Sequence, residues 1–223
     1  MSMFVEAGSG RPVPFDLRSV VLAGYTGRDQ ESVKRHIEEL AEHGVPGPER
    51  VPTFYSATPG MVVAADAIEV LGSETSGEAE FTLFHSDGEL YVGAASDHTD
   101  RAIERDSITY AKQLCPKVVS REVWRYADVA PHWDQVTLRS FAGEERTIYQ
   151  EGPAADMLDP EDILARVEKR TGRGLDGVLV FSGTLPLAAE LTFANRFEVE
   201  LRDETNGQTL SLRYRIDVTE PLD

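Results

Sequence analysis

Two glutamates separated by one residue, Glu78 and Glu80 in "GEAEF", have the spacing that most directly indicates chemistry. Alternate residues of a β-strand face the same side, so the two carboxylates lie about 6.5–7 Å apart on one face. Carboxylates held this close repel each other unless a cation lies between them. Asp97 ends the next predicted strand, which returns antiparallel toward the same end of the sheet. Three such oxygen ligands suit Mg²⁺ or Mn²⁺, with Ca²⁺ as a further candidate.

Each of these residues also has an ordinary structural interpretation. An acid pair at i, i+2 is typical of a strand face exposed to solvent. Ser96 or Asp97 could equally be the N-cap of a helix over "SDHTDRAIERDSITYAKQ", with the other charges exposed. The residues alone leave both interpretations open.

The composition limits the classes of function. The chain has 223 residues, 41% of them hydrophobic, and a formal net charge of −17. Such a surface repels phosphate backbones and anionic membranes, so we expect neither nucleic acid nor a membrane as a partner. Cys115 is the single cysteine, which excludes an intrachain disulfide and suits a reducing compartment. We find no signal peptide and no run of about 18–20 apolar residues, and we therefore expect a cytoplasmic protein.

Short strands dominate the predicted elements. We expect helices over residues 29–43 and over "DPEDILARVEKRTG", and hairpins that turn at "SDG", "AGEE" and Asn206-Gly207. This pattern predicts an α+β fold built on a mostly antiparallel sheet or barrel. We expect one compact unit, in which residues 1–57 form N-terminal strands with a lid-like helix and residues 58–223 form the main β-domain.

Five segments, in order, resemble motifs of the fumarylacetoacetate hydrolase superfamily. "SDHTDRAIE" resembles its Asp-x-Thr/Ser-x-Arg-x-x-Gln signature: Asp97, Thr99 and Arg101 match, and Glu104 stands in place of Gln. "GEAEF" resembles the Glu-x-Glu strand of that family. The other three segments are "TYAKQLCP", "EERTIYQEGPAADMLDPEDILARV" and "GVLVFSGTLPL". Together they span roughly residues 58–190, and the chain resembles a small branch of the superfamily.

This resemblance implies a mixed β-sandwich roll or barrel of the fumarylacetoacetase C-terminal-like type, usually a homodimer. It implies a divalent-metal-dependent enzyme acting on a small 2-oxo acid or 1,3-dicarbonyl compound, by C–C hydrolysis or by hydration or dehydration. The metal would stabilise an enolate. By motif, Glu78, Glu80 and Asp97 would bind the metal, Lys112 would be catalytic, and Arg101, Glu104 and Thr184 would lie at the substrate.

The catalytic base depends on how the lid helix is aligned with the family. Hydrolytic members activate water with a His–Glu pair on a lid helix, and "GRDQESVKRHIEEL" is the equivalent segment here. With a shift of three residues, His36 and Glu39 form that pair and share one face of the helix. His36 also lies on the apolar stripe of Val33 and Leu40, where it would only pack.

Two other functions therefore remain open. Without the His36–Glu39 pair, a decarboxylase or tautomerase would need only the metal and Lys112. A non-catalytic binding protein could retain the fold without the chemistry. His98 and His132 could suggest a second metal site or a general base, but we expect structural roles for both.

Overall fold

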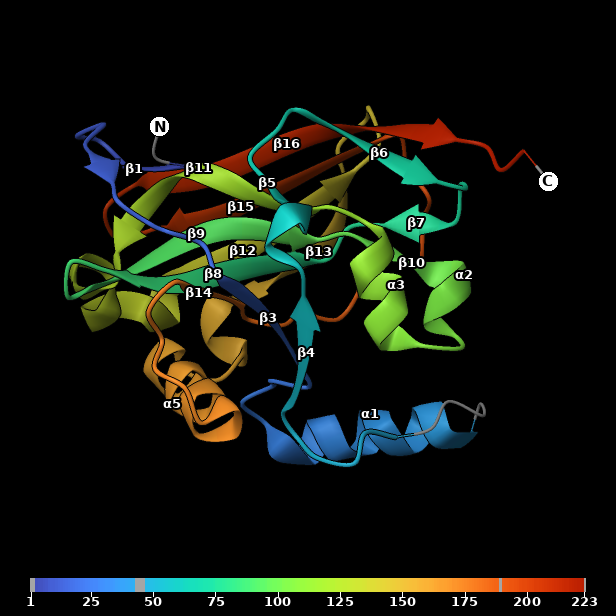
Figure 1. The fold of residues 1–223 in the computed structure, drawn as a ribbon, viewed down its shortest axis with the longest axis horizontal. Helices are drawn as coiled ribbons and strands as arrows, with labels where there is room; N and C mark the ends of the chain where they lie inside the picture. The colour runs from blue at the N-terminus through green and yellow to red at the C-terminus, as the bar shows by residue number, and fades with distance from the viewer. Residues whose placement is uncertain (1–2, 43–46, 189, 223) are drawn as a thin grey trace.

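The protein, described by a computed structural model over residues 3–42, 47–188 and 190–222, is built on two large β-sheets (Figure 1). Of the two large sheets within the described residues, the larger one carries residues that the sequence predicts to bind a metal. In spatial order its strands are β2 (Pro12–Val13), β1 (Phe4–Glu6), β11 (Lys117–Arg125), β9 (Glu89–Asp97), β8 (Ala79–Ser86), β14 (Val178–Phe181), β3 (Ser19–Gly24) and β4 (Thr53–Ala57), with β5 (Val62–Val63) paired to β11. Strands from residues 1–57 and from residues 58–223 thus share this sheet.

The second sheet packs against the larger one. Its strands, in order, are β13 (Thr147–Pro153), β12 (Val136–Ala142), β15 (Arg196–Asp203), β16 (Gln208–Thr219) and β6 (Ala67–Leu71). Apolar and polar residues alternate along β15 and β16, so one face of this sheet is buried and the other meets solvent. The β15–β16 turn contains Gly207 at φ 64°, as Asn206-Gly207 predicts. A separate two-stranded ladder joins β7 (Thr75–Ser76) to β10 (Thr99–Asp100).

Short helices surround the sheets, and Figure 1 shows α1 and α5 on the side away from β16. The helices are α1 (Gln30–Glu42), α2 (Arg101–Glu104), α3 (Ile108–Leu114), α4 (Tyr126–Val129) and α5 (Pro160–Thr171), with 3-10 turns η1 (Pro59–Met61), η2 (Ala130–Gln135) and η3 (Ala154–Asp156). The caps of α5 follow the sequence. Asp159 accepts a hydrogen bond from the Glu161 amide, and Gly172 ends the helix at φ 63°. Within the described residues, no helix has both the length and the apolarity to cross a bilayer.

Two apolar cores lie on opposite faces of the large sheet. Phe81 and Leu83 of β8 face the core between the sheets, whereas Phe84 belongs to the outer core. There it stacks on Phe4 with ring centroids 4.6 Å apart. Because side chains alternate along a strand, the even-numbered Glu80 shares the outer face with Phe84.

The predicted α+β class is confirmed, but the alternative helix beginning at Ser96 or Asp97 is wrong. Strand β9 continues through Asp97 because the Asp97 amide donates to the Glu78 carbonyl at 3.0 Å. The first helix after it is α2, which is capped by Asp100; the Asp100 carboxylate accepts from the Ile103 amide at 2.9 Å.

Candidate metal centre

The carboxylates of Glu78, Glu80 and Asp97 converge at one end of β8 and β9. Each offers an oxygen within 4.8 Å of the other two. The pairing of β8 with β9 places Ala79 opposite Ser96, which brings the residues on either side into register. Glu80 is 1% exposed and Asp97 is fully buried, so this is not a solvated strand face.

The chain after β14 holds Glu80 in place. The Gly183 amide donates to Glu80 Oε2 at 2.8 Å, and the Thr26 hydroxyl donates to the Ser182 carbonyl at 2.6 Å. Gly183 has φ 87°, and a β-carbon there would lie 2.3 Å from Thr26 Oγ1. Only glycine fits this position, because any side chain would push β3 away from the segment that carries the hydrogen bond to Glu80.

Two buried lysines pair with the acidic cluster. Lys112 of α3 lies 2.8 Å from Glu78 Oε2 and 2.6 Å from Asp97 Oδ2. Lys117 of β11 lies 2.7 Å from Asp97 Oδ1, and both side chains of this pair are fully buried. The sequence interpretation included Lys112 but missed Lys117. The register between β9 and β11, which no local sequence pattern shows, places Lys117 directly opposite Asp97.

The pKa values of the carboxyls are driven apart by these neighbours. Burial alone would raise the pKa of Glu78, but the charges of Lys112 and Arg101 outweigh it and hold that pKa at about 2. Burial and the charge of Asp97 raise the pKa of Glu80 well above its ordinary value. Glu80 therefore holds a proton more readily than Glu78, and a cation at the cluster would replace that proton.

Lys112 stays charged in spite of its burial. Burial lowers the pKa of an ammonium group, but the carboxylates of Asp97, Glu78 and Glu80 together raise the Lys112 pKa well above its usual value. A protonated lysine at this place can stabilise an anion or donate a proton, but it cannot serve as a base.

The donor set fits a hard divalent cation. It consists of carboxylate oxygens, with no cysteine or histidine nitrogen among the three groups that converge. Mg²⁺, Mn²⁺ and Ca²⁺ prefer oxygen ligands, whereas structural zinc prefers sulfur and nitrogen. Three protein ligands also leave coordination positions for water or for a chelating ligand.

Arg101 links the triad to Glu104. Its Nη1 donates to Glu78 Oε1 at 2.9 Å and to Glu104 Oε2 at 2.7 Å, and its Nε donates to Ser76 Oγ at 2.8 Å. The structure thus brings two of the three predicted substrate-binding residues to the edge of the acidic cluster.

Thr184, the third of them, is anchored to β8. Its hydroxyl donates to the Ala79 carbonyl at 2.8 Å and accepts from Gln150 Nε2 at 2.6 Å. Gln150 is fully buried and also accepts from the Ala79 amide at 2.8 Å. This glutamine therefore positions both Thr184 and the start of the strand that carries Glu80.

Two tyrosines missed by the sequence interpretation lie near Glu104 and Lys112. Tyr25 follows β3 at φ 57°, an uncommon conformation for a residue other than glycine. Burial raises its pKa, the charge of Glu104 raises it further, and Lys112 lowers it. Burial likewise raises the pKa of Tyr55 on β4, with a contribution from Tyr25. Both phenols are protonated at neutral pH and can donate hydrogen bonds.

The predicted His36–Glu39 pair lies on α1, but both side chains fall outside the described part of the structure. The pair stays a prediction. His98 is buried, and its ring nitrogens each lie 3.0 Å from a hydroxyl, that of Tyr214 or that of Thr75. Burial, together with the charges of Lys117 and Arg101, lowers its pKa to about 3, so the ring is neutral. His132 bonds Asp203 at 2.9 Å, beneath the β15–β16 turn.

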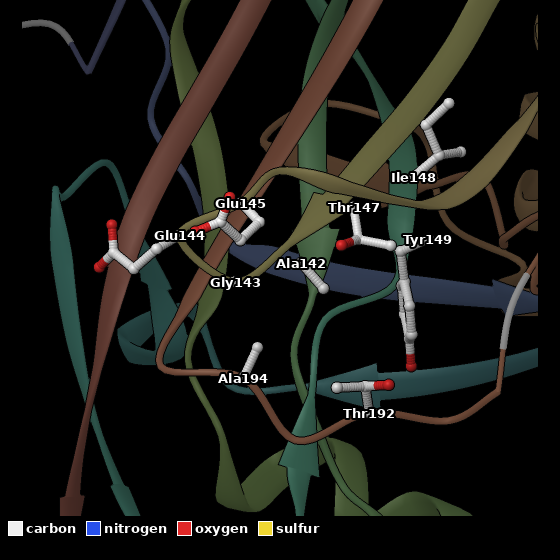
Figure 2. A pocket seen from close by; sticks show the side chains of 9 residues that line it. All are labelled: Ala142, Gly143, Glu144, Glu145, Thr147, Ile148, Tyr149, Thr192 and Ala194. Carbon is white, nitrogen blue, oxygen red and sulfur yellow. The ribbon is translucent and has the colours of Figure 1, made fainter.

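A hollow of about 250 Å³ lies at the β12–β13 hairpin, apart from the acidic cluster, and Figure 2 shows the side chains that line it. The buried Tyr149 points its hydroxyl toward Thr192 in this view. Glu144, Glu145 and Ile148 also line this hollow, and none of the predicted site residues do. The candidate site is therefore defined by its convergent charges and not by this hollow.

Solved structures define the class to which this fold belongs. A proposed fumarylpyruvate hydrolase from Burkholderia cenocepacia aligns with a TM-score of 0.67 at 17% identity, over 98% of this chain and 91% of that one. A proposed fumarylacetoacetate hydrolase family protein from Yersinia pestis CO92 aligns with a TM-score of 0.66 at 17% identity, over 96% and 99% of the two chains. These likenesses confirm the predicted fold, that of the fumarylacetoacetate hydrolase family.

A third similar structure was solved with ligands. It is a 2-keto-3-deoxy-D-arabinonate dehydratase complexed with magnesium and 2,5-dioxopentanoate, with a TM-score of 0.64 at 17% identity over 95% of this chain and 76% of that one. No curated protein is detectably similar in sequence. The chain belongs to the DUF2848 family, described as a protein of unknown function, whose model matches residues 23–214.

Proposed function

We propose that this protein is a divalent-metal-dependent enzyme that acts on a small 2-oxo acid or 1,3-dicarbonyl compound through an enolate. The observation that carries the proposal is the convergence of Glu78, Glu80 and Asp97 within 4.8 Å, buried and paired with a charged Lys112. The hydrolase and dehydratase descriptions of proteins that share the fold support it. We propose Mg²⁺ or Mn²⁺ as the metal.

The side chains divide the work of such a reaction. A bound cation would supply Lewis-acid stabilisation of negative charge on the substrate oxygens. Lys112 lies beside the same carboxylates with its proton retained, so it can stabilise the developing anion or return a proton to it. Gln150 and Gly183 fix the strand and the carboxylate that would hold the cation. The surrounding burial excludes water from these interactions, which strengthens them.

The reaction type depends on the lid helix. C–C hydrolysis or hydration needs an activated water, which the predicted His36–Glu39 pair would provide. Decarboxylation or tautomerisation needs only the metal and Lys112. We propose hydrolysis or hydration and dehydration first, because the hydrolase and dehydratase descriptions above attach to this fold.

Deuterium exchange tests the step that all these reactions share. Pyruvate incubated in D₂O with the protein and Mg²⁺ should exchange the hydrogens of its methyl group. Water or the predicted His36–Glu39 pair takes a methyl proton, and the enolate that remains takes a deuteron from Lys112, whose ammonium hydrogens exchange with D₂O. NMR follows the loss of the methyl proton signal. The Glu80→Gln and Lys112→Met variants should each lose at least about 100-fold in exchange rate, within the range of single catalytic groups. Glu69→Gln, which removes one exposed acid from β6, is the matched control and should exchange like the wild type.

Two outcomes would count against the proposal. Mg²⁺ binding without any exchange would favour a non-catalytic binding protein. Exchange that persists in Glu80→Gln and in EDTA would exclude the acidic triad as its cause.

A third outcome would distinguish the reaction types. If exchange occurs and turnover of a 2-oxo acid survives the double change of His36 and Glu39 to alanine, the decarboxylase or tautomerase function is favoured.

A further inference from the structure

The positive charge of Arg101 is neutralised by ion pairs within the protein. Its side chain is 12% exposed, and Nη1 alone contacts both Glu78 and Glu104. Nε is occupied by the Ser76 hydroxyl. An arginine held between two carboxylates has no unpaired positive charge for an anionic group of a substrate.

Glu104 adds negative charge on the open side of the same residue. Its side chain is 29% exposed, more than that of Glu78 at 14% or Asp97 at 0%. Among the acids that contact Arg101 or Lys112, Glu104 is thus the one that a ligand extending away from the triad would meet. A second carboxylate on that ligand would face Glu104 at close range, where like charges repel strongly in a partly buried site.

Two uncharged aromatic side chains lie near Glu104 and Lys112. Tyr25, which follows β3, and Tyr55 of β4 are partly buried, and the charges of Glu104 and Lys112 act on both of their hydroxyls. Their protonated phenols can each donate to a ligand oxygen.

We propose that Glu104 makes this site select a 2-oxo acid whose tail is uncharged and polar, and reject one whose tail carries a second carboxylate. The carboxyl and oxo groups at the head would meet the metal triad, and the tail would lie among Glu104, Tyr25 and Tyr55. This selectivity rests on the proposed function, because it assumes that the head binds at the triad. Glu104 is the specificity-determining residue, and it stands where the family signature has an uncharged Gln.

The test compares two ligands that differ in the charge of the tail and in the one methyl group of the ester. Calorimetry with the Mg²⁺-loaded protein would measure the binding of 2-oxoglutarate and of its 5-methyl ester. The wild type should bind the ester at least about tenfold more tightly than the dianion, because a like charge at this range costs at least that much after screening. In Glu104→Gln the preference should fall to within about twofold, through tighter binding of 2-oxoglutarate.

Glu74→Gln is the matched control. Glu74 is 53% exposed and pairs with Arg105 near the same helix, so its loss changes the net charge equally without removing a partner of Arg101. It should leave the preference of the wild type unchanged.

The outcomes separate the two proposals. If wild-type protein binds 2-oxoglutarate as tightly as the ester, or if Glu104→Gln and Glu74→Gln behave alike, the selectivity is overturned while metal-dependent binding of a 2-oxo acid stands. If neither ligand binds to the Mg²⁺-loaded protein, and Mg²⁺ itself gives no heat, the proposed function fails and the selectivity fails with it.

Discussion

The ion pairs around Asp97 and those on the outer face of β16 use the same kinds of side chain in opposite surroundings. Asp97 and Lys117 are fully buried, whereas Arg215 and Asp217 are 58% and 44% exposed and lie within a regular strand. A buried pair costs desolvation energy that apolar residues in its place would avoid, and an exposed pair costs and contributes little. Buried charge is therefore retained at the β8–β9 end in spite of its effect on stability, which is typical of a functional site.

Loss of Asp97 should show the largest difference between the two regions. The Asp97→Ala change leaves Lys112 and Lys117 without their shared partner, so we expect the free energy of unfolding to fall by about 3–5 kcal/mol. Urea denaturation at pH 7 measures it. A loss below about 1 kcal/mol would mean that solvent reaches these lysines and that the contrast with β16 is false.

Lys117→Met should destabilise less, because Asp97 keeps Lys112 and methionine fills a similar volume. We expect a loss of about 2–3 kcal/mol, and Mg²⁺ binding at least about tenfold tighter, since one positive charge next to a ligand is removed. Denaturation and calorimetry on the same samples check both effects. Weaker Mg²⁺ binding would show instead that Lys117 is needed to orient Asp97.

The raised pKa of Glu80 predicts that cation binding at the triad releases a proton. Below its folded-state pKa the carboxyl is protonated, so Mg²⁺ affinity should increase with pH, by up to about tenfold per unit, and level off above that pKa. Calorimetry in two buffers with different ionisation enthalpies counts the released protons. Glu80→Gln should remove the pH dependence along with most of the affinity; an unchanged proton count in that variant would assign the release to another group.

The smallest effect belongs to the exposed pair. Asp217→Ala should change the free energy of unfolding by no more than about 0.5 kcal/mol, because the Arg215 guanidinium it leaves behind remains hydrated. The same urea experiment measures it beside Asp97→Ala. A loss of several kcal/mol would show that burial does not separate the two regions.

Much of the fold could be predicted from the sequence because its signals are local. Neighbouring residues are enough to predict three features: the period-two alternation of β15 and β16, the Asn206-Gly207 turn and the caps of α5. The convergence of Glu78, Glu80 and Asp97 needed only one strand period and one hairpin.

The remaining parts of the site depend on contacts between distant segments. Lys117 reaches Asp97 through the register between β9 and β11, and Gly183 reaches Glu80 from the segment after β14, about a hundred residues later in the chain. The ordinary helix interpretation of residues 96–113 failed for a related reason: pairing with β8 outcompetes the local capping preference of Ser96 and Asp97. Tyr25 and Tyr55 carry no local signal, since only the β3–β4 pairing brings them near each other.

Because the Gly183 amide donates a hydrogen bond to Glu80, the signal of this backbone group can report the protonation state of the acidic triad. When Glu80 changes from a protonated acid to a carboxylate, its oxygen becomes a stronger acceptor, and the shielding and exchange rate of the Gly183 amide hydrogen change with it. A ¹⁵N-labelled sample would therefore display the charge state of the acidic triad as the chemical shift of a single glycine resonance, before any substrate is known.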